Sequence, residues 1–370
     1  MREVQLLIVG AGPAGLSAAC EAARAGVQVQ VIDENLRPGG QLFKQLHKFF
    51  GSRVHHAGTR GFQIGKELLK ETEDLGVEVH LGYPVYGIFK DNQVVYGTAD
   101  GVKKLHAQKI ILATGANENN LCFEGSVLPG VMTAGAAQTM VNLHHVLPGH
   151  KVVMIGSGNV GLIVSYQLLQ AGAEVQAIVE AAPAIGGYGV HANKLKRAGV
   201  PFYLSHTVRR VTGTDGVEAV EIIQVDDKFQ PIPGTEKQLE ADSVCMAVGL
   251  TPMIELAYLG GCKMTECPAL GGVVPLHNEN MQTTNEDIYI AGDISGVEEA
   301  STAMEEGRLA GVSAAEALGC LPEAAAEEKK QEIRARLKLL RSGQFGQRRA
   351  DAKQTIEDTF RQQEEGGEPV

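Results

Sequence analysis

One pattern of apolar residues and glycines occurs twice in the chain, and it constrains the fold more than any other feature. Each copy has an apolar run, a Gly-x-Gly-x-x-Gly segment, a helix-like stretch that ends at a glycine, and a second apolar run that ends in acid. The first glycines of the two copies, Gly10 and Gly156, lie 146 residues apart. A strand, a tight turn and a helix in this order predict a Rossmann-like α/β module, and the repeat predicts two of them.

The three glycines of such a segment have different tasks. The first allows a tight turn, the second lets the backbone approach a pyrophosphate, and the third lets helix and strand pack closely. Free N–H groups at the start of the helix then bind phosphate, helped by the helix dipole. The residues that we expect to bind a nucleotide in this way are Gly10, Gly12, Pro13, Ala14 and Gly15 in the first copy, and Gly156, Gly158, Asn159, Val160 and Gly161 in the second.

An acid ends the second apolar run of each copy, where it can accept a hydrogen bond from a ribose hydroxyl. In the second copy this acid is Glu180, and no Arg follows it within seven residues, which favours NAD(H) over NADP(H). In the first copy both Asp33 and Glu34 are candidates. Glu34 matches Glu180 when residues are counted from Gly26 and Gly172, whereas Asp33 directly closes the apolar run. We keep both candidates, with Asp33 preferred.

Composition and charge exclude several other classes of protein. The chain has 33 Lys and Arg residues against 44 Asp and Glu, and its net charge of −11 repels nucleic acid and anionic lipid. Aromatic residues make up only 5% of the chain, unlike proteins that stack bases on aromatic rings. No apolar run reaches the roughly 20 residues of a membrane helix, and the first residues do not resemble a signal peptide. We therefore expect a soluble cytoplasmic protein with no nucleic acid partner and no membrane span.

Three further apolar runs end in short motifs: Ala-Thr-Gly at 113–115, Ala-Val-Gly-Leu-Thr-Pro at 247–252 and Ala-Gly-Asp at 291–293. With the two glycine segments they resemble, in order, flavoproteins with two dinucleotide-binding domains, of the glutathione and thioredoxin reductase type. The resemblance covers residues 1–320. It implies that the first module binds FAD, that Asp293 contacts the ribityl chain of the flavin, and that the second module binds a nicotinamide nucleotide. Further FAD contacts implied in this way are Gly40, Gln41, Ala113, Thr114, Gly115 and Gly292.

Longer segments resemble a narrower group, the FAD/NAD-type alpha subunits of hetero-oligomeric amine and amino-acid dehydrogenases. This group includes subunits of proline and hydroxyproline dehydrogenases, opine oxidases, sarcosine oxidases and hydrogen cyanide synthase. In such complexes a second flavoprotein subunit oxidises the substrate, and electrons pass through a flavin at the subunit interface or through an iron–sulfur subunit. The resemblance thus implies NAD(H) or another adenine nucleotide as the second nucleotide and FMN at an interface. The segments that carry it are 37–41, 128–138, 270–277, 279–282 and 298–311.

The order of these segments gives a domain plan. We expect an α/β protein with two Rossmann-like modules of the thioredoxin reductase type, the second inserted in the first, and without the C-terminal dimerisation domain of the glutathione reductases. A short amphipathic helix is predicted over residues 323–341, because apolar residues recur there at helical spacing. From Ser342 onward we expect disorder. The predicted parts are residues 1–121 and 248–322 for the FAD domain, 122–247 for the inserted nucleotide domain, and 323–370 for a helical and partly disordered tail.

The cysteines depart from the reductase pattern. The Cys-x-x-Cys of thioredoxin reductases is missing from residues 131–138, and the Cys-x4-Cys of glutathione reductases is missing from residues 35–66. We therefore expect no direct dithiol–disulfide chemistry at the flavin. Cys262 and Cys267 are the one close pair, and we interpret them as structural thiols, because a cluster or a zinc needs four ligands. The alternative is a redox dithiol or half of a cluster site. No metal site and no catalytic acid or base is predicted.

Residues 35–66 contain six Lys and Arg, three His and no acid, which is unusual in a chain of this net charge. Two interpretations stay open for this basic segment. It could form an electropositive surface for the phosphate of a second flavin or for an acidic partner subunit, or it could be a solvated basic loop.

Three functions are compatible with the sequence. The first is an FAD-dependent electron-transfer subunit of a hetero-oligomeric amine or amino-acid dehydrogenase, with the catalytic residues unidentified. The second is a stand-alone NADH-dependent flavin reductase of a ferredoxin or quinone-type acceptor. The third is a scaffold subunit in which adenine nucleotides are structural.

Overall fold

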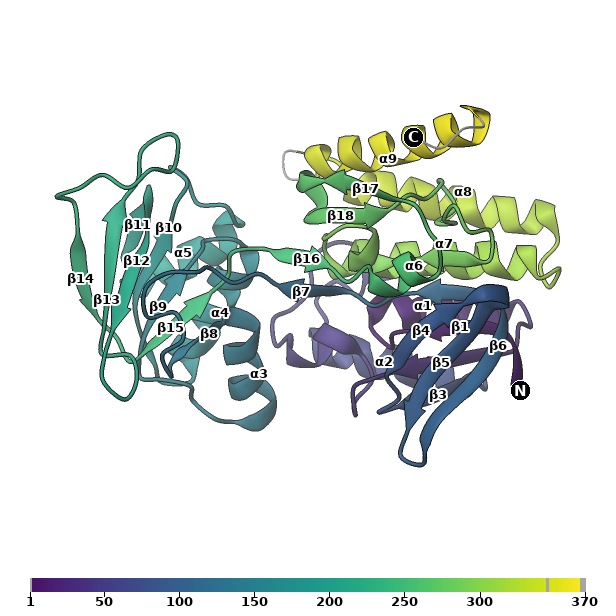
Figure 1. Ribbon diagram of the computed structural model, residues 1–370, viewed down its shortest axis with the longest axis horizontal. Coiled ribbons are helices and arrows are strands. Elements are labelled where there is room, and N and C mark those ends of the chain that lie inside the picture. The colour runs from purple at the N-terminus through teal and green to yellow at the C-terminus, as the bar shows by residue number, and fades with distance from the viewer. Residues whose placement is uncertain (1, 344–345, 367–370) are drawn as a thin grey trace. The chain divides into compact units, whose positions relative to one another are not determined.

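The computed structural model describes residues 2–343 and 346–366 and divides the chain into two compact units (Figure 1). Unit 1 comprises Met1–Asn117 and Thr251–Val370, and unit 2 comprises Glu118–Leu250. The sequence predicts an inserted module over residues 122–247. The chain passes between the units along two short strands that pair with each other, β7 (Ala116–Glu118) and β16 (Leu250–Pro252).

Unit 1 is built on a seven-stranded sheet that is mostly parallel. Its last two strands along the sheet are antiparallel to their neighbours. The central strand reads Val-Gln-Leu-Leu-Ile-Val and is buried on both faces, as expected for a strand covered on each side. The strands, in sheet order, are β3 (Glu78–Leu81), β2 (Val29–Asp33), β1 (Arg2–Val9), β6 (Gly101–Leu112), β5 (Gln93–Thr98) and β4 (Val85–Phe89), with β19 (Ile288–Ile290) beside β6.

Helices α1 and α7 of unit 1 pack backbone to backbone. Gly307 and Gly311 of α7 face the carbonyl oxygens of Ala14 and Ala18 on α1, and a Cβ atom at either glycine would lie closer than 3.0 Å to that oxygen. Small residues at both positions therefore set the separation of the two helices. The helices of unit 1 are α1 (Pro13–Arg24), α2 (Gly61–Asp74), α6 (Glu255–Leu259), α7 (Ala300–Ala317), α8 (Glu323–Leu340) and α9 (Gln347–Gly366).

The C-terminal segment differs from its expectation. The sequence predicts a helix over 323–341 and disorder beyond it, whereas the structure forms both α8 and α9 (Figure 1). Three apolar residues on one face of α9 (Ala352, Ile356 and Phe360) are buried against Leu270, Val274 and Leu276. This contact stabilises α9 in spite of its charged composition. Residues 344–345 and 367–370 of the predicted tail lie outside the described residues. The hairpin beneath α9 consists of β17 (Met264–Cys267) and β18 (Gly272–Pro275).

Unit 2 has three layers: helices, a five-stranded parallel sheet and a three-stranded antiparallel sheet. Alternate residues of β9 (Lys151–Ile155) enter different cores, since Val152 and Met154 pack with the helices whereas Val153 and Ile155 pack with the antiparallel sheet. The elements are β11 (Phe202–Leu204), β10 (Glu174–Glu180), β9 (Lys151–Ile155), β15 (Ser243–Met246) and β8 (Val131–Thr133) in the parallel sheet, β12 (His206–Thr212), β13 (Ala219–Gln224) and β14 (Lys237–Glu240) in the other, and helices α3 (Ala134–His144), α4 (Asn159–Gln170) and α5 (Gly189–Arg197).

Both units are therefore Rossmann-like, and the expected α/β fold class is confirmed. Among the described residues, no helix has both the length and the apolar composition needed to cross a bilayer.

Candidate dinucleotide-binding sites

The first glycine segment connects β1 to α1 in unit 1. Gly10 has a φ of +109°, and a Cβ atom there would overlap the carbonyl oxygen of Ala113. A Cβ at Gly15 would likewise overlap the carbonyl oxygen of Gly10. Gly12 differs, because the nearest described atom to its Cβ position is the Cα of Gly40, at 4.0 Å. The first and third glycines are thus required by packing, whereas the second leaves room beside the backbone.

The start of α1 is suited to an anion. The helix begins at Pro13, whose fixed φ suits the first helical position and whose missing N–H costs no helical bond. Within the described residues, no side chain caps the helix and its first turn contains no acid. The N–H groups of Ala14 and Gly15 in that turn can therefore bind phosphate, with the helix dipole favouring negative charge.

Unit 2 repeats this geometry between β9 and α4. Gly156 has a φ of +101°, and its Cβ would overlap the carbonyl oxygen of Ala247. Gly161 packs against Gly156 in the same way. At Gly158, no atom of the described residues lies within 4 Å of the Cβ position. Two separate units therefore present the same turn, each with an open side at its second glycine.

The first two residues of α4 complete the comparison with α1. Asn159 uses its side-chain oxygen to accept the N–H of Tyr188 at 2.8 Å, so this side chain holds a neighbouring loop. Val160 is 39% exposed. In the described residues α4, like α1, has no side-chain cap and no acid in its first turn.

The acid of unit 1 that occupies the expected place is Asp33. Its Oδ2 accepts the N–H of Ala11 at 2.6 Å, and its Oδ1 accepts the N–H of Asn35 at 2.7 Å. Asp33 is buried, whereas Glu34 is exposed. A carboxylate oxygen has lone pairs left after one such bond, so Asp33 can still accept a ribose hydroxyl.

Glu180 of unit 2 makes the matching pair of bonds. Its Oε2 accepts the N–H of Ser157 at 2.8 Å, and its Oε1 accepts the N–H of Ala182 at 2.9 Å. In both units the bonded residues are therefore the one after the first glycine and the one two positions beyond the acid. The geometry equates Glu180 with Asp33, not with Glu34.

A β-bulge explains why counting along the sequence aligns Glu34 with Glu180. The pairing of β10 with β9 shifts between Val175 and Ala177, whereas β2 pairs with β1 without a shift. The bulge adds one residue to the second strand of unit 2 before its acid.

Each unit also has a loop that returns to the glycine turn, and sequence reasoning found only one of the two. In unit 1 the N–H of Gly39 donates to the carbonyl of Ala11 at 2.6 Å, which brings Gly40 beside Gly12. Gln41, in the 3-10 helix η1 (Gly40–Lys44), is exposed.

In unit 2 the corresponding loop contains Gly186 and Gly187. The N–H of Gly187 donates to the carbonyl of Ser157 at 2.9 Å, and that of Gly186 donates to the Ser157 hydroxyl at 3.0 Å. The signal for this loop was a pair of glycines six and seven residues after the acid, which resembles the position of Gly39 and Gly40 after Asp33.

The residues Ala113, Thr114 and Gly115 follow β6, next to the first glycine turn. The N–H of Ala113 donates to the carbonyl of Val9 at 2.8 Å, and the Thr114 hydroxyl donates to the carbonyl of Met253 at 2.7 Å. Because β1 and β6 are parallel neighbours, these residues lie at the same edge of the sheet as Gly10.

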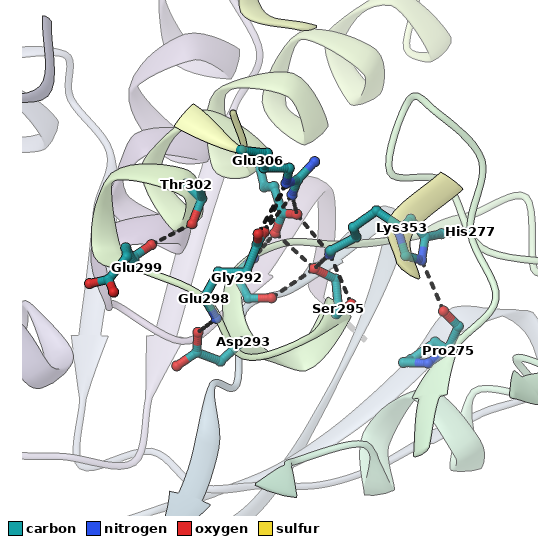
Figure 2. Close-up of polar contacts among 11 residues, drawn as sticks. Pro275, His277, Gly292, Asp293, Ser295, Glu298, Glu299, Thr302, Glu306 and Lys353 are labelled. Atoms are coloured by element: carbon teal, nitrogen blue, oxygen red, sulfur yellow. Dashed lines mark hydrogen bonds and ion pairs between the residues drawn. The ribbon is translucent and has the colours of Figure 1, made fainter. Parts of the chain in front are cut away.

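Gly292 and Asp293 reach that edge from β19, which pairs with β6. They open the 3-10 helix η5 (Gly292–Ser295), and Gly292 has a φ of +78°. The Oδ1 of Asp293 accepts the N–H of Glu298 at 3.3 Å (Figure 2). Burial raises the pKa of Asp293 to about 6, and the nearby carboxylates of Glu306 and Glu298 add to the rise.

The model of the pyridine nucleotide-disulphide oxidoreductases matches residues 4–307. The chain belongs to this family. The expected membership of a flavoprotein family with two dinucleotide-binding modules is thereby confirmed, and the chain is a flavin-dependent oxidoreductase. The family implies binding of FAD and of a nicotinamide dinucleotide.

Several relatives in the family are subunits of oxidases and of a synthase. An opine oxidase subunit of Agrobacterium tumefaciens (strain Ach5) is 29% identical over 326 residues, covering 84% of this chain and 65% of the relative. The HcnB subunit of hydrogen cyanide synthase from Pseudomonas aeruginosa is 26% identical over 368 residues, covering 92% and 77%. The alpha subunit of sarcosine oxidase from Rhizobium meliloti (strain 1021) is 31% identical over 275 residues, covering 70% of this chain and 25% of the relative. The chain thus spans less than two thirds of this opine oxidase relative and about a quarter of the sarcosine oxidase relative.

Solved structures share the fold. Thioredoxin reductase of T. acidophilum superposes with a TM-score of 0.71 at 23% identity, covering 86% of this chain and 99% of that one. L-proline dehydrogenase of P. horikoshii superposes with a TM-score of 0.66 at 23% identity, covering 89% and 59%.

The cysteines of this family member lie away from the positions that the reductases use. Burial raises the pKa of Cys20 to about 11 and that of Cys245 to about 12. Burial also raises the pKa of Cys262, whose Sγ lies 3.2 Å from the hydroxyl of Thr283. These three thiols therefore stay protonated near neutral pH, which suits structural residues. Cys267 is partly exposed at the end of β17.

The basic segment 35–66 is partly an internal element. His55, in the 3-10 helix η2 (Arg53–His55), is buried with its Nε2 3.1 Å from Oε1 of Glu305 on α7. Burial lowers the pKa of His55, although the Glu305 carboxylate opposes this. Arg37 and Lys48 are exposed. Because these cations are exposed, an electropositive surface on this segment stays a hypothesis. The contact of His55 with Glu305 attaches the segment to α7.

The residues present fit dinucleotides in both units. Each second glycine leaves space beside a helix start, each acid is held in place by two backbone N–H groups, and each return loop lies against the glycine turn. In unit 1, residues 113–115 and 292–293 lie at the same sheet edge as Gly10. The ribose and flavin contacts of the individual residues remain predictions.

Proposed function

We propose that the chain is the FAD-binding electron-transfer subunit of a hetero-oligomeric amine or amino-acid dehydrogenase. Two observations together carry the proposal. Each unit has a glycine turn that leaves space for a dinucleotide beside the start of a helix. The cysteine pairs of the reductases are missing from residues 35–66 and 131–138. A flavin without a neighbouring dithiol has no protein disulfide with which to exchange electrons, and in this proposal it exchanges them with another carrier. The opine oxidase and sarcosine oxidase relatives are themselves subunits, and this supports a second protein chain as that carrier.

In this proposal FAD lies in unit 1 and accepts or passes on electrons when bound. The N–H groups after Gly12 hold its diphosphate, Asp33 accepts from the adenosine ribose, and Asp293 accepts from the ribityl chain. The start of α7 follows Asp293, and its helix dipole favours negative charge on the reduced flavin. Unit 2 holds NAD(H) or another adenine nucleotide, with its ribose on Glu180.

The partner is a second flavoprotein subunit that oxidises the amine. Electrons reach unit 1 through FMN at the interface or through an iron–sulfur subunit. The exposed cations of the basic segment, such as Arg37 and Lys48, are the surface that we propose for the FMN phosphate or for the partner.

Purification of the tagged chain from its native cells tests this function. We expect a second flavoprotein subunit to co-purify, and mass spectrometry of the released ligands to identify FAD and the second nucleotide. The isolated chain should not oxidise proline-like or sarcosine-like amines, whereas the complex should. Amine oxidation by the isolated chain at the rate of the complex would contradict the proposal.

The glycine turn of unit 2, with Glu180 beside it, favours a second candidate function, a stand-alone NADH-dependent flavin reductase. Anaerobic mixing of the purified chain with NADH should then bleach the flavin absorbance, and a ferredoxin or quinone should restore it. If NADH leaves the spectrum unchanged while an adenine nucleotide stays bound to unit 2, the nucleotide is structural and this candidate is excluded.

A further inference from the structure

Unit 1 contains a buried ionic cluster that the family motifs do not describe. We call it the Glu306 cluster, and Glu306 at its centre is 1% exposed. Lys353 of α9 is 2% exposed, which is exceptional for a lysine. The members of the Glu306 cluster are Ser295, Glu298, Glu306, Arg341 and Lys353.

The two carboxylate oxygens of Glu306 divide their partners between the turn and two cations of the C-terminal segment (Figure 2). Oε2 accepts the N–H of Gly292 at 2.9 Å and the hydroxyl of Ser295 at 2.8 Å. Oε1 accepts the ammonium of Lys353 at 2.8 Å and the guanidinium of Arg341 at 2.5 Å. Glu306 thus links the turn that carries Asp293 to the two cations.

The two cations also contact the turn and its continuation directly. Lys353 donates to the carbonyl of Ser295 at 2.8 Å and to its hydroxyl at 2.5 Å. Arg341, which follows α8, donates to Glu298 through two nitrogens at 2.6 to 3.1 Å. The N–H of Glu298 in turn donates to Asp293. These hydrogen bonds of Lys353 and Arg341 therefore lead to η5 and to the residues that follow it.

The charges explain why the cluster needs both cations. A buried carboxylate is unstable unless it is paired. Burial opposes the ionisation of Glu306, but Lys353 and Arg341 more than compensate and hold its pKa well below the ordinary value of a glutamate. The nearby charge of Lys353 also lowers the pKa of Asp293, against the effects of burial, Glu306 and Glu298.

We propose that Lys353 and Arg341 are positioning residues of the flavin site, which hold Gly292 and Asp293 in place through Glu306 and Glu298. Helix α9 is then part of the FAD site, although it lies beyond residues 4–307 that the family shares. This inference depends on the proposed binding of FAD in unit 1. Neither cation touches the flavin in this proposal, and both act through the turn.

The substitution Lys353→Met tests the inference on the full-length chain. Without the ammonium, Glu306 and Glu298 lack half of their counter-charge and the Ser295 carbonyl loses its donor. We expect the dissociation constant of FAD at pH 7 to rise about tenfold or more, measured by flavin fluorescence. In the proposal the ionised Asp293 accepts a hydrogen bond from FAD, so we expect FAD affinity to decline as falling pH protonates Asp293. Because the charge of Lys353 lowers the pKa of Asp293, this decline should begin at a higher pH in K353M than in the wild type.

A matched control is Lys329→Met. Lys329 lies on α8, has a side chain that is 44% exposed, and pairs with Glu21 at 3.4 Å, away from the Glu306 cluster. This variant should bind FAD as the wild type does. The double variant K353M/E306Q removes one charge of each sign, and it should bind FAD more tightly than K353M alone.

Ser295→Ala covers the case in which K353M does not fold. It removes one hydroxyl that bonds both Lys353 and Glu306, and we expect a rise of about threefold in the dissociation constant. If K353M folds and its FAD affinity and pH profile are unchanged, the inference is wrong. If K353M does not fold, unchanged FAD affinity in S295A would overturn it. Either result would leave the proposed function standing. A wild-type chain that does not bind FAD would overturn both the inference and the proposed function.

Discussion

At the scale of single residues, the two modules agree most closely in how they hold their acids. Asp33 and Glu180 each accept two backbone N–H groups from equivalent positions. The sequence predicts both residues as ribose acceptors, with Asp33 and Glu34 left as alternatives in the first module. The feature that decides between Asp33 and Glu34 is the bulge in the pairing of β10 with β9, which shifts Glu180 by one residue. No residue type in the sequence marks a bulge of this kind.

The two alternatives can be separated by a pair of substitutions. Asp33→Asn replaces the carboxylate that accepts the N–H groups of Ala11 and Asn35 by a neutral amide. We expect the FAD dissociation constant to rise about tenfold and the free energy of unfolding to fall by about 1–3 kcal/mol. Glu34→Gln, on an exposed side chain, should change neither value. Fluorescence titration and chemical unfolding measure the two quantities, and a larger loss in E34Q than in D33N would refute the assignment.

Asp293 makes the stability of the apo-protein depend on pH. Its pKa is raised to about 6 in the folded chain, so the folded state binds a proton more tightly than the unfolded state does. The stability that this proton confers is complete below the ordinary pKa of an aspartate and is lost as the pH rises through about 6. Asp293→Asn stays neutral, and it should therefore gain stability relative to the wild type between pH 4 and pH 7. Urea unfolding at both pH values tests this, and a constant difference would argue against it.

At the scale of secondary structure, the contact between α1 and α7 depends on glycine. The sequence predicts that residues 10–15 form the phosphate-binding turn at the start of α1. It does not predict that Gly307 and Gly311 of α7 pack against α1. Their contacts join residues about 300 positions apart, and local patterns carry no information about such pairs. Helix α9 was missed for a different reason, since its charged residues suggested disorder. The spacing of Ala352, Ile356 and Phe360 at i, i+4 and i+8 was the signal that could have revealed it.

The α1–α7 contact predicts the effect of a single methyl group. Gly311→Ala places a Cβ against the carbonyl oxygen of Ala18, and the helices must separate to accommodate it. We expect a loss of about 1–3 kcal/mol in the free energy of unfolding. Gly189→Ala, at the first residue of α5 where no described atom lies within 4 Å of the new Cβ, should be neutral or stabilising. Equal effects of the two substitutions in thermal unfolding would disprove the packing argument.

At the scale of the whole molecule, one Rossmann-like module is inserted in the chain of another. The sequence repeat predicts two such modules, because the turn, the helix and the acid that define each module are local features of the chain. The Glu306 cluster was not visible in this way, since its members come from segments that are distant in the sequence.

The two modules should lose their nucleotides independently. A valine at Gly12 or Gly158 meets no atom of the described residues closer than 4.0 Å at its Cβ, and neither glycine has a positive φ, so we expect both variants to fold. The side chain would instead occupy the space beside the helix start. G12V should therefore lack FAD and keep the second nucleotide, and G158V should do the reverse. Mass spectrometry of the ligands released from each variant measures this, and loss of both nucleotides from either one would speak against separate sites.

The bulge in β10 also limits how the modules can be recombined. Grafting the segment from Ala173 to Glu180 onto the first module would transplant an extra residue into an unbulged ladder. Side chains alternate between the faces of a strand, so the grafted carboxylate would emerge on the wrong face of the sheet. A chimaera of this protein would have to delete one residue of the graft to keep its acid beside the glycine turn.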